Sequence, residues 1–360
     1  MTLPAALATE FCRLVGVQYP VVQTGMGWVS GAKLTAATAQ AGGLGILASA
    51  TMTLPELRTA IASVTAATDR PFGVNLRTDS PDVEDRVRLI IESGVKVASF
   101  AQAPGRETIA RLKDAGVVTM PTIGARRHAE KVAEWGVDAI IAQGREGGGH
   151  TGAVPTSLLI PQCVDAVDIP VIAAGGFFDG RGLVAALAWG AAGIAMGTRF
   201  LLTSDSEVPD PIKARYLQAS VTDTVVTKAI DGYPQRVIRT EMVDDLESST
   251  LTRLPKAVLN ALRFSRLTGT SKRDLVREGL AMRSNQGLTW AQLAMAANAP
   301  MLTRASMVEG RMDVGILPTG QGVGVIDTLP SAADVVSSIM EQASGVLARL
   351  TGVETRSLEP

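Results

Sequence analysis

The sequence predicts an α/β fold, a TIM (β/α)8 barrel with a mostly helical insertion after strand eight. Eight short apolar runs alternate with helical patterns over roughly the first two hundred residues. The runs are continuously apolar, which is typical of parallel strands covered by helices. The chain has 360 residues, about a hundred more than the roughly 250 of a plain barrel, so there is room for an insertion.

The predicted strands follow one another in chain order as Tyr19–Thr24, Leu44–Ser49, Phe72–Leu76, Val95–Phe100, Val117–Pro121, Ala139–Gln143, Pro170–Ala174 and Gly193–Met196. The predicted helices are Ala32–Ala41, Leu54–Val64, Pro81–Glu92, Arg106–Ala115, Arg126–Trp135, Gly180–Trp189 and a last barrel helix at Ser331–Leu350. Several of them end beside a glycine that suits a helix C-cap, namely Gly42, Gly94, Gly116, Gly136 and Gly190. Eight strands in this order favour a closed barrel over an open doubly wound sheet.

The composition changes after Phe200. Residues 205–247 carry nine acidic and five basic side chains, whereas residues 253–283 carry eight basic and two acidic ones. Helical patterns at Arg273–Met282 and Trp290–Asn298 predict a mostly helical module. We therefore assign 1–204 and 311–360 to the barrel and 205–310 to a helical insertion that covers the substrate.

The composition also argues against several classes of protein. The net charge is −1, so no global charge attracts nucleic acid. The two cysteines, Cys12 and Cys163, predict neither a disulfide framework nor a metal cluster and indicate a reducing compartment. Residues 1–10 lack the basic region of a signal peptide. We expect a soluble cytoplasmic protein that binds neither nucleic acid nor a membrane.

The ends of strands seven and eight carry a candidate phosphate site, because barrel active sites are built from the loops at the carboxyl ends of the strands. These loops contain Gly175-Gly176 and Met196-Gly197-Thr198. Glycine lets backbone N–H groups approach a phosphate closely, and the threonine hydroxyl adds a donor. The alternative is that the glycines only tighten turns, but two such loops on adjacent strands favour phosphate.

The glycine-rich segment Gln143–Gly152 follows strand six and carries His150, one of two histidines. Imidazole donates or accepts a proton near neutral pH. An isolated loop histidine is often only a surface residue, yet the position after a barrel strand favours a catalytic function. The other histidine, His128, lies on a polar helix face and is interpreted as a surface residue. No ligand spacing predicts a metal, and no Ser–His–Asp pattern is present.

Taken in order, these motifs resemble the nitronate monooxygenase (2-nitropropane dioxygenase) family, which also includes a flavin-containing enoyl-acyl-carrier reductase. The resemblance covers most of the chain, through Pro20–Met26, Ala41–Gly45, Phe72–Asn75, Gln143–Gly152, Ala173–Gly176 and Met196–Phe200. It implies a TIM barrel that binds FMN. The chain departs from the family pattern at Gly147, where many members have alanine.

The resemblance also implies residue roles. Gly25 and Met26 would back the isoalloxazine, and Asn75 and Gln143 would hydrogen-bond to it. The remaining cofactor-binding residues would line the flavin or hold its phosphate, namely Gly148, Gly149, Gly175, Gly176, Met196, Gly197 and Thr198. His150 would lie near flavin N5 as a base or as a substrate-orienting group, with Glu146 as its candidate orienting partner.

A closer resemblance is to a branch of this family from actinobacterial steroid degradation, through Gln23–Trp28, Gly42–Thr53, Glu146–Gly152, Ala173–Gly182 and Gly197–Ser206. It implies flavin-dependent desaturation of a bicyclic steroid-ring acyl-CoA, a CoA thioester. The basic stretch 253–283 would then either attract CoA phosphates or form a solvated surface balanced by 205–247, and both interpretations carry equal weight.

Other functions remain open at this point: nitronate oxidation with O2, enoyl-thioester reduction, and flavin or CoA binding without catalysis. The sequence leaves the electron acceptor and the direction of the reaction open. A homodimer is one assembly that it allows.

Overall fold

The computed structural model describes residues 4–248, 300–313 and 315–352. Eight parallel strands close into a barrel, because β1 pairs with both β2 and β9. The predicted TIM barrel is confirmed, and each predicted strand lies within a few residues of an observed one. The barrel strands are β1 (Val21–Gln23), β2 (Leu44–Ala48), β3 (Gly73–Leu76), β4 (Val97–Phe100), β5 (Val118–Ile123), β6 (Ile140–Gln143), β8 (Val171–Ala174) and β9 (Gly193–Met196).

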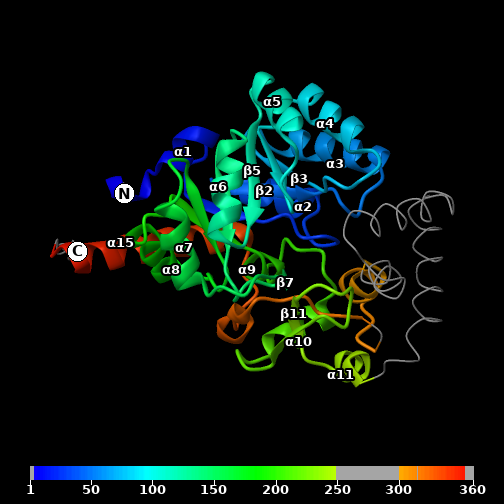
Figure 1. Cartoon of the computed structure of the whole chain (residues 1–360). Helices are drawn as coiled ribbons and strands as arrows, with labels where there is room; N and C mark the ends of the chain where they lie inside the picture. The colour runs from blue at the N-terminus through cyan, green and yellow to red at the C-terminus, as the bar shows by residue number, and fades with distance from the viewer. Residues whose placement is uncertain (1–3, 249–299, 314, 353–360) are drawn as a thin grey trace.

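Helices surround the barrel, as Figure 1 shows. They are α2 (Ala32–Gln40), α3 (Leu54–Ala67), α4 (Val83–Glu92), α5 (Arg106–Asp114), α6 (Arg126–Glu134), α7 (Thr156–Val164), α8 (Gly180–Ala188) and α15 (Ala332–Thr351). The predicted last helix is confirmed as α15, which packs against both α8 and α2 and so completes the ring. The predicted C-cap glycines all have positive φ, as this conformation requires, at Gly42, Gly94, Gly116, Gly136 and Gly190.

A short helix that the sequence analysis does not predict, α1 (Glu10–Val15), closes the bottom of the barrel. Its Phe11 and Val15 side chains are buried in one cluster with inward-facing strand residues such as Val22, Ile46 and Ile141. The Thr9 hydroxyl donates a 2.6 Å hydrogen bond to the carbonyl oxygen of Ala192, just before β9. The amino-terminal end of the barrel is therefore filled by apolar side chains.

Helix α7 is also absent from the predicted elements. Pro161 lies inside it, and a proline removes a backbone N–H and normally argues against a helix. Leu159, Ile160 and Cys163 are nevertheless fully buried on α7, so packing against the sheet outweighs the cost of the proline. The helix occupies the expected place between β6 and β8.

The described part of the insertion contains more strand than predicted. It begins after α9 (Thr198–Leu201) and holds α10 (Asp210–Leu217), β10 (Thr224–Thr227), β11 (Gln235–Ile238) and α11 (Glu241–Ser248). β10 and β11 form an antiparallel hairpin, and β11 pairs in turn with β7 (Gly149–His150) from the loop after β6. The predicted helices Arg273–Met282 and Trp290–Asn298 lie outside the described residues, and the boundaries 205–310 and 311–360 stay predictions.

The insertion and the segment that follows it share a small apolar core, formed by Ile230, Val237, Val243, Leu302 and Ile316. In Figure 1 the hairpin, α10 and α11 lie together on one side of the barrel, beside the chain that follows residue 300. Because β11 pairs with β7, the insertion is joined directly to the barrel loop that carries His150.

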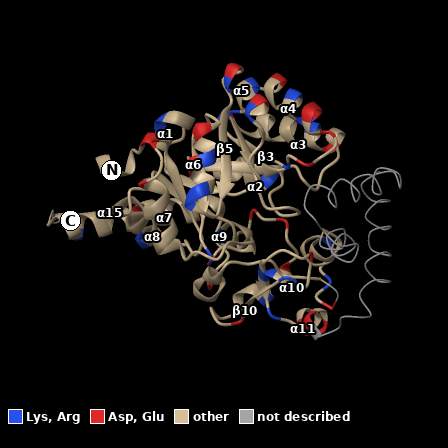
Figure 2. Cartoon of the chain, viewed as in Figure 1, with Lys and Arg blue, Asp and Glu red and all other residues tan. Residues whose placement is uncertain are grey.

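Charged residues of both signs lie mainly on the outer helices, whereas the barrel strands in view are uncharged (Figure 2). Cys12 and Cys163 are free and buried. Burial raises the pKa of the Cys163 thiol to about 11. None of the helices in the described residues is long and apolar enough to cross a membrane.

Candidate active site

The loop after β1 is held by the fully buried amide of Gln23. Its Nε2 donates to the Ser30 hydroxyl at 2.8 Å and to the carbonyl oxygen of Ile46 at 3.1 Å. The Ser30 hydroxyl donates to the Thr24 carbonyl oxygen and accepts from the Met26 N–H at 2.9 Å. Gln23 and Ser30 therefore fix the backbone of Gly25 and Met26, a supporting role that the sequence analysis does not assign.

The structure brings four of the predicted flavin-binding residues together. A Cβ on Gly25 would lie 2.4 Å from Cβ of Asn75, so only glycine fits against this side chain. A Cβ on Gly197 would lie 3.4 Å from Sδ of Met26. Asn75 is held by a 3.2 Å hydrogen bond from its Nδ2 to the Ser99 hydroxyl. The carboxyl ends of β1, β3 and β9 thus meet at one surface.

The segment after β6 is more ordered than a simple glycine loop. Gln143 Nε2 donates to the carbonyl oxygen of His150 at 2.7 Å, which folds the segment back on the strand that precedes it. The departure from the family at Gly147 has a structural reason. A Cβ there would lie 2.6 Å from Nε2 of Gln143, so glycine lets the Gln143 side chain reach His150.

His150 pairs with a carboxylate that belongs to the insertion. Its Nε2 lies 2.7 Å from Oδ2 of Asp231. The Asp231 side chain is 7% exposed and that of His150 is 65% exposed. Gln235 Nε2 also hydrogen-bonds to the same oxygen of Asp231, and the Tyr233 N–H donates to Oδ1 at 3.0 Å. The buried Asp231 carboxylate, which accepts several hydrogen bonds, therefore pairs with an accessible imidazole.

This network assigns the imidazole tautomer. A carboxylate only accepts hydrogen bonds, so His150 Nε2 carries the hydrogen that points at Asp231. Nδ1 makes no hydrogen bond to any described residue, and it is left to accept or release a proton. Asp231 is one of the nine acidic residues of 205–247, and nothing in their pattern distinguishes it. The pairing of β7 with β11, which opposes His150 and Gln235, creates the contact.

The sequence predicts that Glu146 orients His150, but the Glu146 side chain contacts Thr156 and makes no described contact with His150. Its Oε2 accepts hydrogen bonds from the backbone N–H of Thr156 at 2.9 Å and from the Thr156 hydroxyl at 2.7 Å. Thr156 is the first residue of α7. Because the first N–H groups of a helix lack partners within the helix, a carboxylate at this position stabilises its amino terminus. The orienting carboxylate of His150 is Asp231 instead.

A segment that the sequence analysis misses, Thr319–Gly322, contacts several of the predicted site loops. The Gly320 N–H donates to the Thr198 hydroxyl at 2.9 Å, and the Gln321 N–H donates to the carbonyl oxygen of Glu146 at 3.0 Å. A Cβ on Gly148 would lie 2.4 Å from the carbonyl carbon of Thr319. The run Thr-Gly-Gln-Gly-Val-Gly at 319–324 is the signal that would have marked this segment.

The predicted phosphate loops present unpaired donors. The backbone N–H groups of Gly175, Gly176, Gly197 and Thr198 make no hydrogen bond within the described chain. Gly175 and Gly176 have φ of 109° and 81°, which a residue with a side chain adopts at a cost. Gly176 is exposed, and Gly175, Gly197 and Thr198 are half-buried. Accessible N–H groups without partners suit an anion.

One further orphaned atom lies at the same end of the barrel. Oε1 of the buried Gln23 has no hydrogen-bond partner in the described chain. A flavin carries a phosphate and a ring edge with both donors and acceptors, so these residues fit such a group. Among the described residues, no cluster of three His, Cys, Asp or Glu side chains could hold a metal ion.

A family model described as nitronate monooxygenase matches residues 9–342. The chain belongs to this family. It is 58% identical over 355 residues to (3aS,4S,5R,7aS)-5-hydroxy-7a-methyl-1-oxo-octahydro-1H-indene-4-carboxyl-CoA dehydrogenase of Mycobacterium tuberculosis, covering 98% of each chain. It is 56% identical to the dehydrogenase of the same name from Rhodococcus jostii, covering 94% of this chain and 96% of that one.

The fold of this nitronate monooxygenase family member is shared with a solved structure of FabK from Thermotoga maritima. The TM-score is 0.78 at 34% identity, covering 96% of this chain and 99% of that chain. The nitronate monooxygenase and FabK proteins are flavin-dependent. The predicted resemblance to the family is confirmed, and so is the resemblance to its steroid-degradation branch.

Proposed function

We propose that this protein is an FMN-dependent dehydrogenase that desaturates a bicyclic steroid-ring acyl-CoA in steroid catabolism. The observation that carries the proposal is the accessible His150 imidazole, held by the buried Asp231 carboxylate at the carboxyl end of the barrel. The two relatives that are 58% and 56% identical are named as dehydrogenases of an indene-carboxyl-CoA. Their names supply the substrate class.

The cofactor in this proposal is FMN. Gly175, Gly176, Gly197 and Thr198 would hold its phosphate through N–H groups that make no hydrogen bond to the described residues. The ring would lie over Gly25, Met26 and Asn75, which the structure brings together, with Gln143 hydrogen-bonding to it and Met196, Gly148 and Gly149 beside it. Bound FMN supplies a two-electron acceptor for the hydride that leaves the β-carbon of the thioester.

His150 removes the α-proton of the thioester. Its Nδ1 is the nitrogen free to accept that proton, because Nε2 donates to Asp231. When the imidazole becomes positively charged, the carboxylate 2.7 Å away stabilises it. Loss of the α-proton and of hydride from the β-carbon leaves a carbon–carbon double bond in the product. Asp231 orients the base and does not itself exchange the proton.

Anaerobic mixing of the FMN-loaded protein with the acyl-CoA tests the proposal. We expect the flavin absorbance near roughly 450 nm, a general property of bound oxidised flavins, to bleach with wild type. The His150→Ala variant should retain FMN and bleach at least about a hundredfold more slowly. His128→Ala is the matched control, because His128 is exposed on α6 and should leave the rate unchanged.

A wild-type protein whose flavin is not bleached by this thioester overturns the proposed reaction. A His150→Ala variant that binds FMN and bleaches at the wild-type rate removes His150 from the mechanism. If the loaded protein acts on no candidate substrate, a flavin- or CoA-binding protein without catalysis is the better interpretation.

The family model favours a second candidate, oxidation of alkyl nitronates by O2. The two functions differ in the substrate that reduces the flavin and in their use of oxygen. Oxygen consumption with propionate-3-nitronate, in the absence of any CoA ester, identifies the nitronate reaction. Bleaching by the acyl-CoA without oxygen uptake from the nitronate identifies the dehydrogenase.

A further inference from the structure

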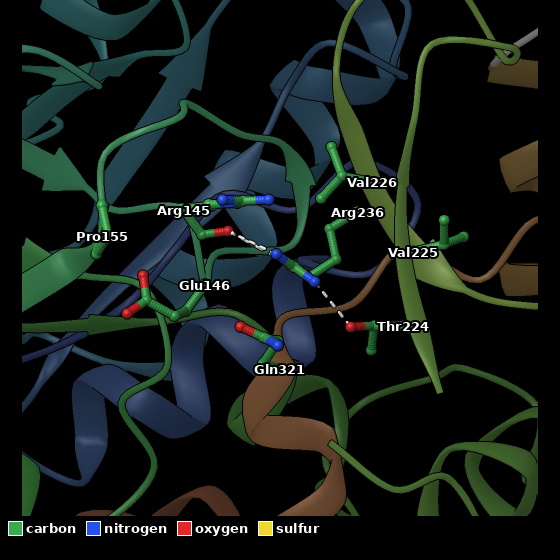
Figure 3. A pocket seen from close by; sticks show the side chains of 8 residues that line it. All are labelled: Arg145, Glu146, Pro155, Thr224, Val225, Val226, Arg236 and Gln321. Carbon is green, nitrogen blue, oxygen red and sulfur yellow. Dashed lines mark hydrogen bonds between the residues drawn. The ribbon is translucent and has the colours of Figure 1, made fainter. Parts of the chain in front are cut away.

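A pocket of about 460 Å³ lies beside the loop that carries His150 (Figure 3). It is lined by Arg145, Glu146, Pro155, Thr224, Val225, Val226, Arg236 and Gln321. None of the glycines of the phosphate loops lines it. Glu146, which lines the pocket, lies against Gly176, where an added Cβ would be 3.3 Å from Cβ of Glu146. The pocket therefore adjoins the surface assigned to the flavin without including its glycines.

Two guanidinium groups border the pocket, and neither has a carboxylate partner among the residues that the structure describes. Arg236 is 5% exposed, and its hydrogen bonds go to the Thr224 hydroxyl at 2.8 Å and to the carbonyl oxygen of Arg145 at 3.1 Å. Figure 3 shows Arg236 between these two acceptors. The Arg145 side chain is exposed and makes no hydrogen bond or ion pair to a described residue. At least two of the five N–H groups of Arg236 remain for a ligand.

The electrostatics of the pocket favour an anion. Burial, and then the nearby charge of Arg145, lower the pKa of Arg236. A buried cation beside a like charge is costly unless a negative group compensates it. The one carboxylate that lines the pocket, Glu146, is engaged by Thr156. Two guanidinium groups against one carboxylate leave a net positive pocket.

The fold relates this pocket to His150. Gln235 and Arg236 are consecutive on β11, so their side chains point to opposite faces of the small sheet. Gln235 reaches Asp231 and His150 on one face, and Arg236 borders the pocket on the other. The long pantetheine arm of a CoA thioester separates its reacting carbons from its phosphates. A thioester at His150 can therefore place its nucleotide end beyond the edge of this sheet.

We propose that the Arg145–Arg236 pocket binds a phosphate group, and that in the working enzyme this group belongs to the nucleotide end of CoA. The assignment to CoA rests on the proposed function. Guanidinium groups bind phosphate through paired, charge-assisted hydrogen bonds, and the Thr224 hydroxyl and the Gln321 amide add neutral polar groups to the same wall. The phosphate subsite is thus built from the barrel loop, the insertion hairpin and the segment after the insertion.

Calorimetric titration of the FMN-loaded protein with CoA, pantetheine and inorganic phosphate tests the subsite. Arg145→Gln is the informative variant, because its side chain has no described partner and its loss should not disturb the fold. We expect Arg145→Gln to bind CoA about tenfold more weakly than wild type and to bind pantetheine equally well. Arg239→Gln is the matched control: Arg239 is a basic residue just after β11 that pairs with Asp244, and its loss should leave both affinities unchanged.

Three results overturn the proposal or its assignment. Equal affinity of Arg145→Gln and wild type for both CoA and inorganic phosphate removes the subsite. An equal loss in Arg239→Gln reduces it to an effect of overall charge. Binding of inorganic phosphate that depends on Arg145, while CoA binding does not, overturns the assignment to CoA.

Failure of the subsite and failure of the proposed function give different results. If wild type binds CoA through Arg145 but the acyl-CoA does not bleach its flavin, the dehydrogenase proposal falls and the subsite stands. If the acyl-CoA bleaches the flavin with the same concentration dependence in Arg145→Gln and wild type, the assignment of the subsite to CoA falls and the dehydrogenase proposal stands.

Discussion

At the scale of single residues, the proposed chemistry depends on a contact between His150 and Asp231, which are 81 positions apart. The imidazole is exposed and the carboxylate is buried, so the pair combines an accessible base with a fixed orienting group. Gln235 and the Tyr233 N–H hold the carboxylate from the side of the insertion. In the proposed mechanism a barrel loop supplies the base, and the insertion supplies the group that sets its tautomer.

Asp231→Asn is expected to lower the rate of flavin bleaching by the acyl-CoA about a hundredfold. An amide can donate to Nε2 and so favour the tautomer with its hydrogen on Nδ1, which removes the free base. Anaerobic stopped-flow measurements on FMN-loaded protein report the rate, and FMN content measured by absorbance should match that of wild type. Asp244→Asn, at an exposed acidic residue of α11, is the control. A wild-type rate in Asp231→Asn would exclude the orienting role.

At the scale of elements, the contacts of the Glu146 carboxylate favour a role in stabilising the amino terminus of α7 over a role in catalysis. Glu146→Gln should lower the free energy of unfolding by about 1 kcal/mol, because a charged acceptor at a helix terminus becomes a neutral one. Its bleaching rate should stay within about threefold of wild type, because the side chain makes no described contact with His150. Urea denaturation and stopped-flow bleaching measure the two effects. A large loss of bleaching rate at unchanged stability would instead indicate that Glu146 takes part in catalysis.

The contact between the His150 loop and the Thr319–Gly322 segment is a second property of the elements. Gly148→Ala would place a Cβ 2.4 Å from backbone atoms of Thr319, and backbone cannot move away as a flexible side chain can. We expect a loss of about 1–3 kcal/mol of stability together with weaker FMN retention. Gly124→Ala is the control, since its Cβ would meet no atom closer than 3.8 Å. Normal FMN content in Gly148→Ala would show that this contact does not shape the site.

At the scale of the whole molecule, stability depends on a barrel closed at its amino-terminal end by α1. Phe11 is fully buried in the cluster that fills the barrel interior. Phe11→Ala should therefore reduce the free energy of unfolding by about 3–5 kcal/mol, measured by urea denaturation. Leu158→Ala, at a leucine that is 58% exposed on α7, should change it by less than about 0.5 kcal/mol. Similar losses in the two variants would contradict the role of α1.

The sequence by itself determined the barrel. Continuous apolar runs, helical periodicity and C-cap glycines such as Gly42 and Gly190 depend on local geometry, and that geometry repeats in every βα unit. The same local rules failed at α7, because Pro161 argues against a helix that burial nevertheless stabilises. They also failed at β10 and β11, because two four-residue strands are marginal until β7 pairs with the hairpin.

The candidate site divides in the same way. Glycines that let a backbone approach a ligand leave a local signature, so the loops at Gly175 and Gly197 and the glycine-rich segment around His150 could be predicted as candidate site loops. The partner of His150 could not be predicted, since the sequence pattern does not distinguish Asp231 from the other eight acidic residues in 205–247. Only the antiparallel register that sets Gln235 opposite His150 brings Asp231 to the imidazole and Arg236 to Arg145. The sequence identified the candidate loops from their local residue types, and tertiary pairing decided which distant side chains lie beside them.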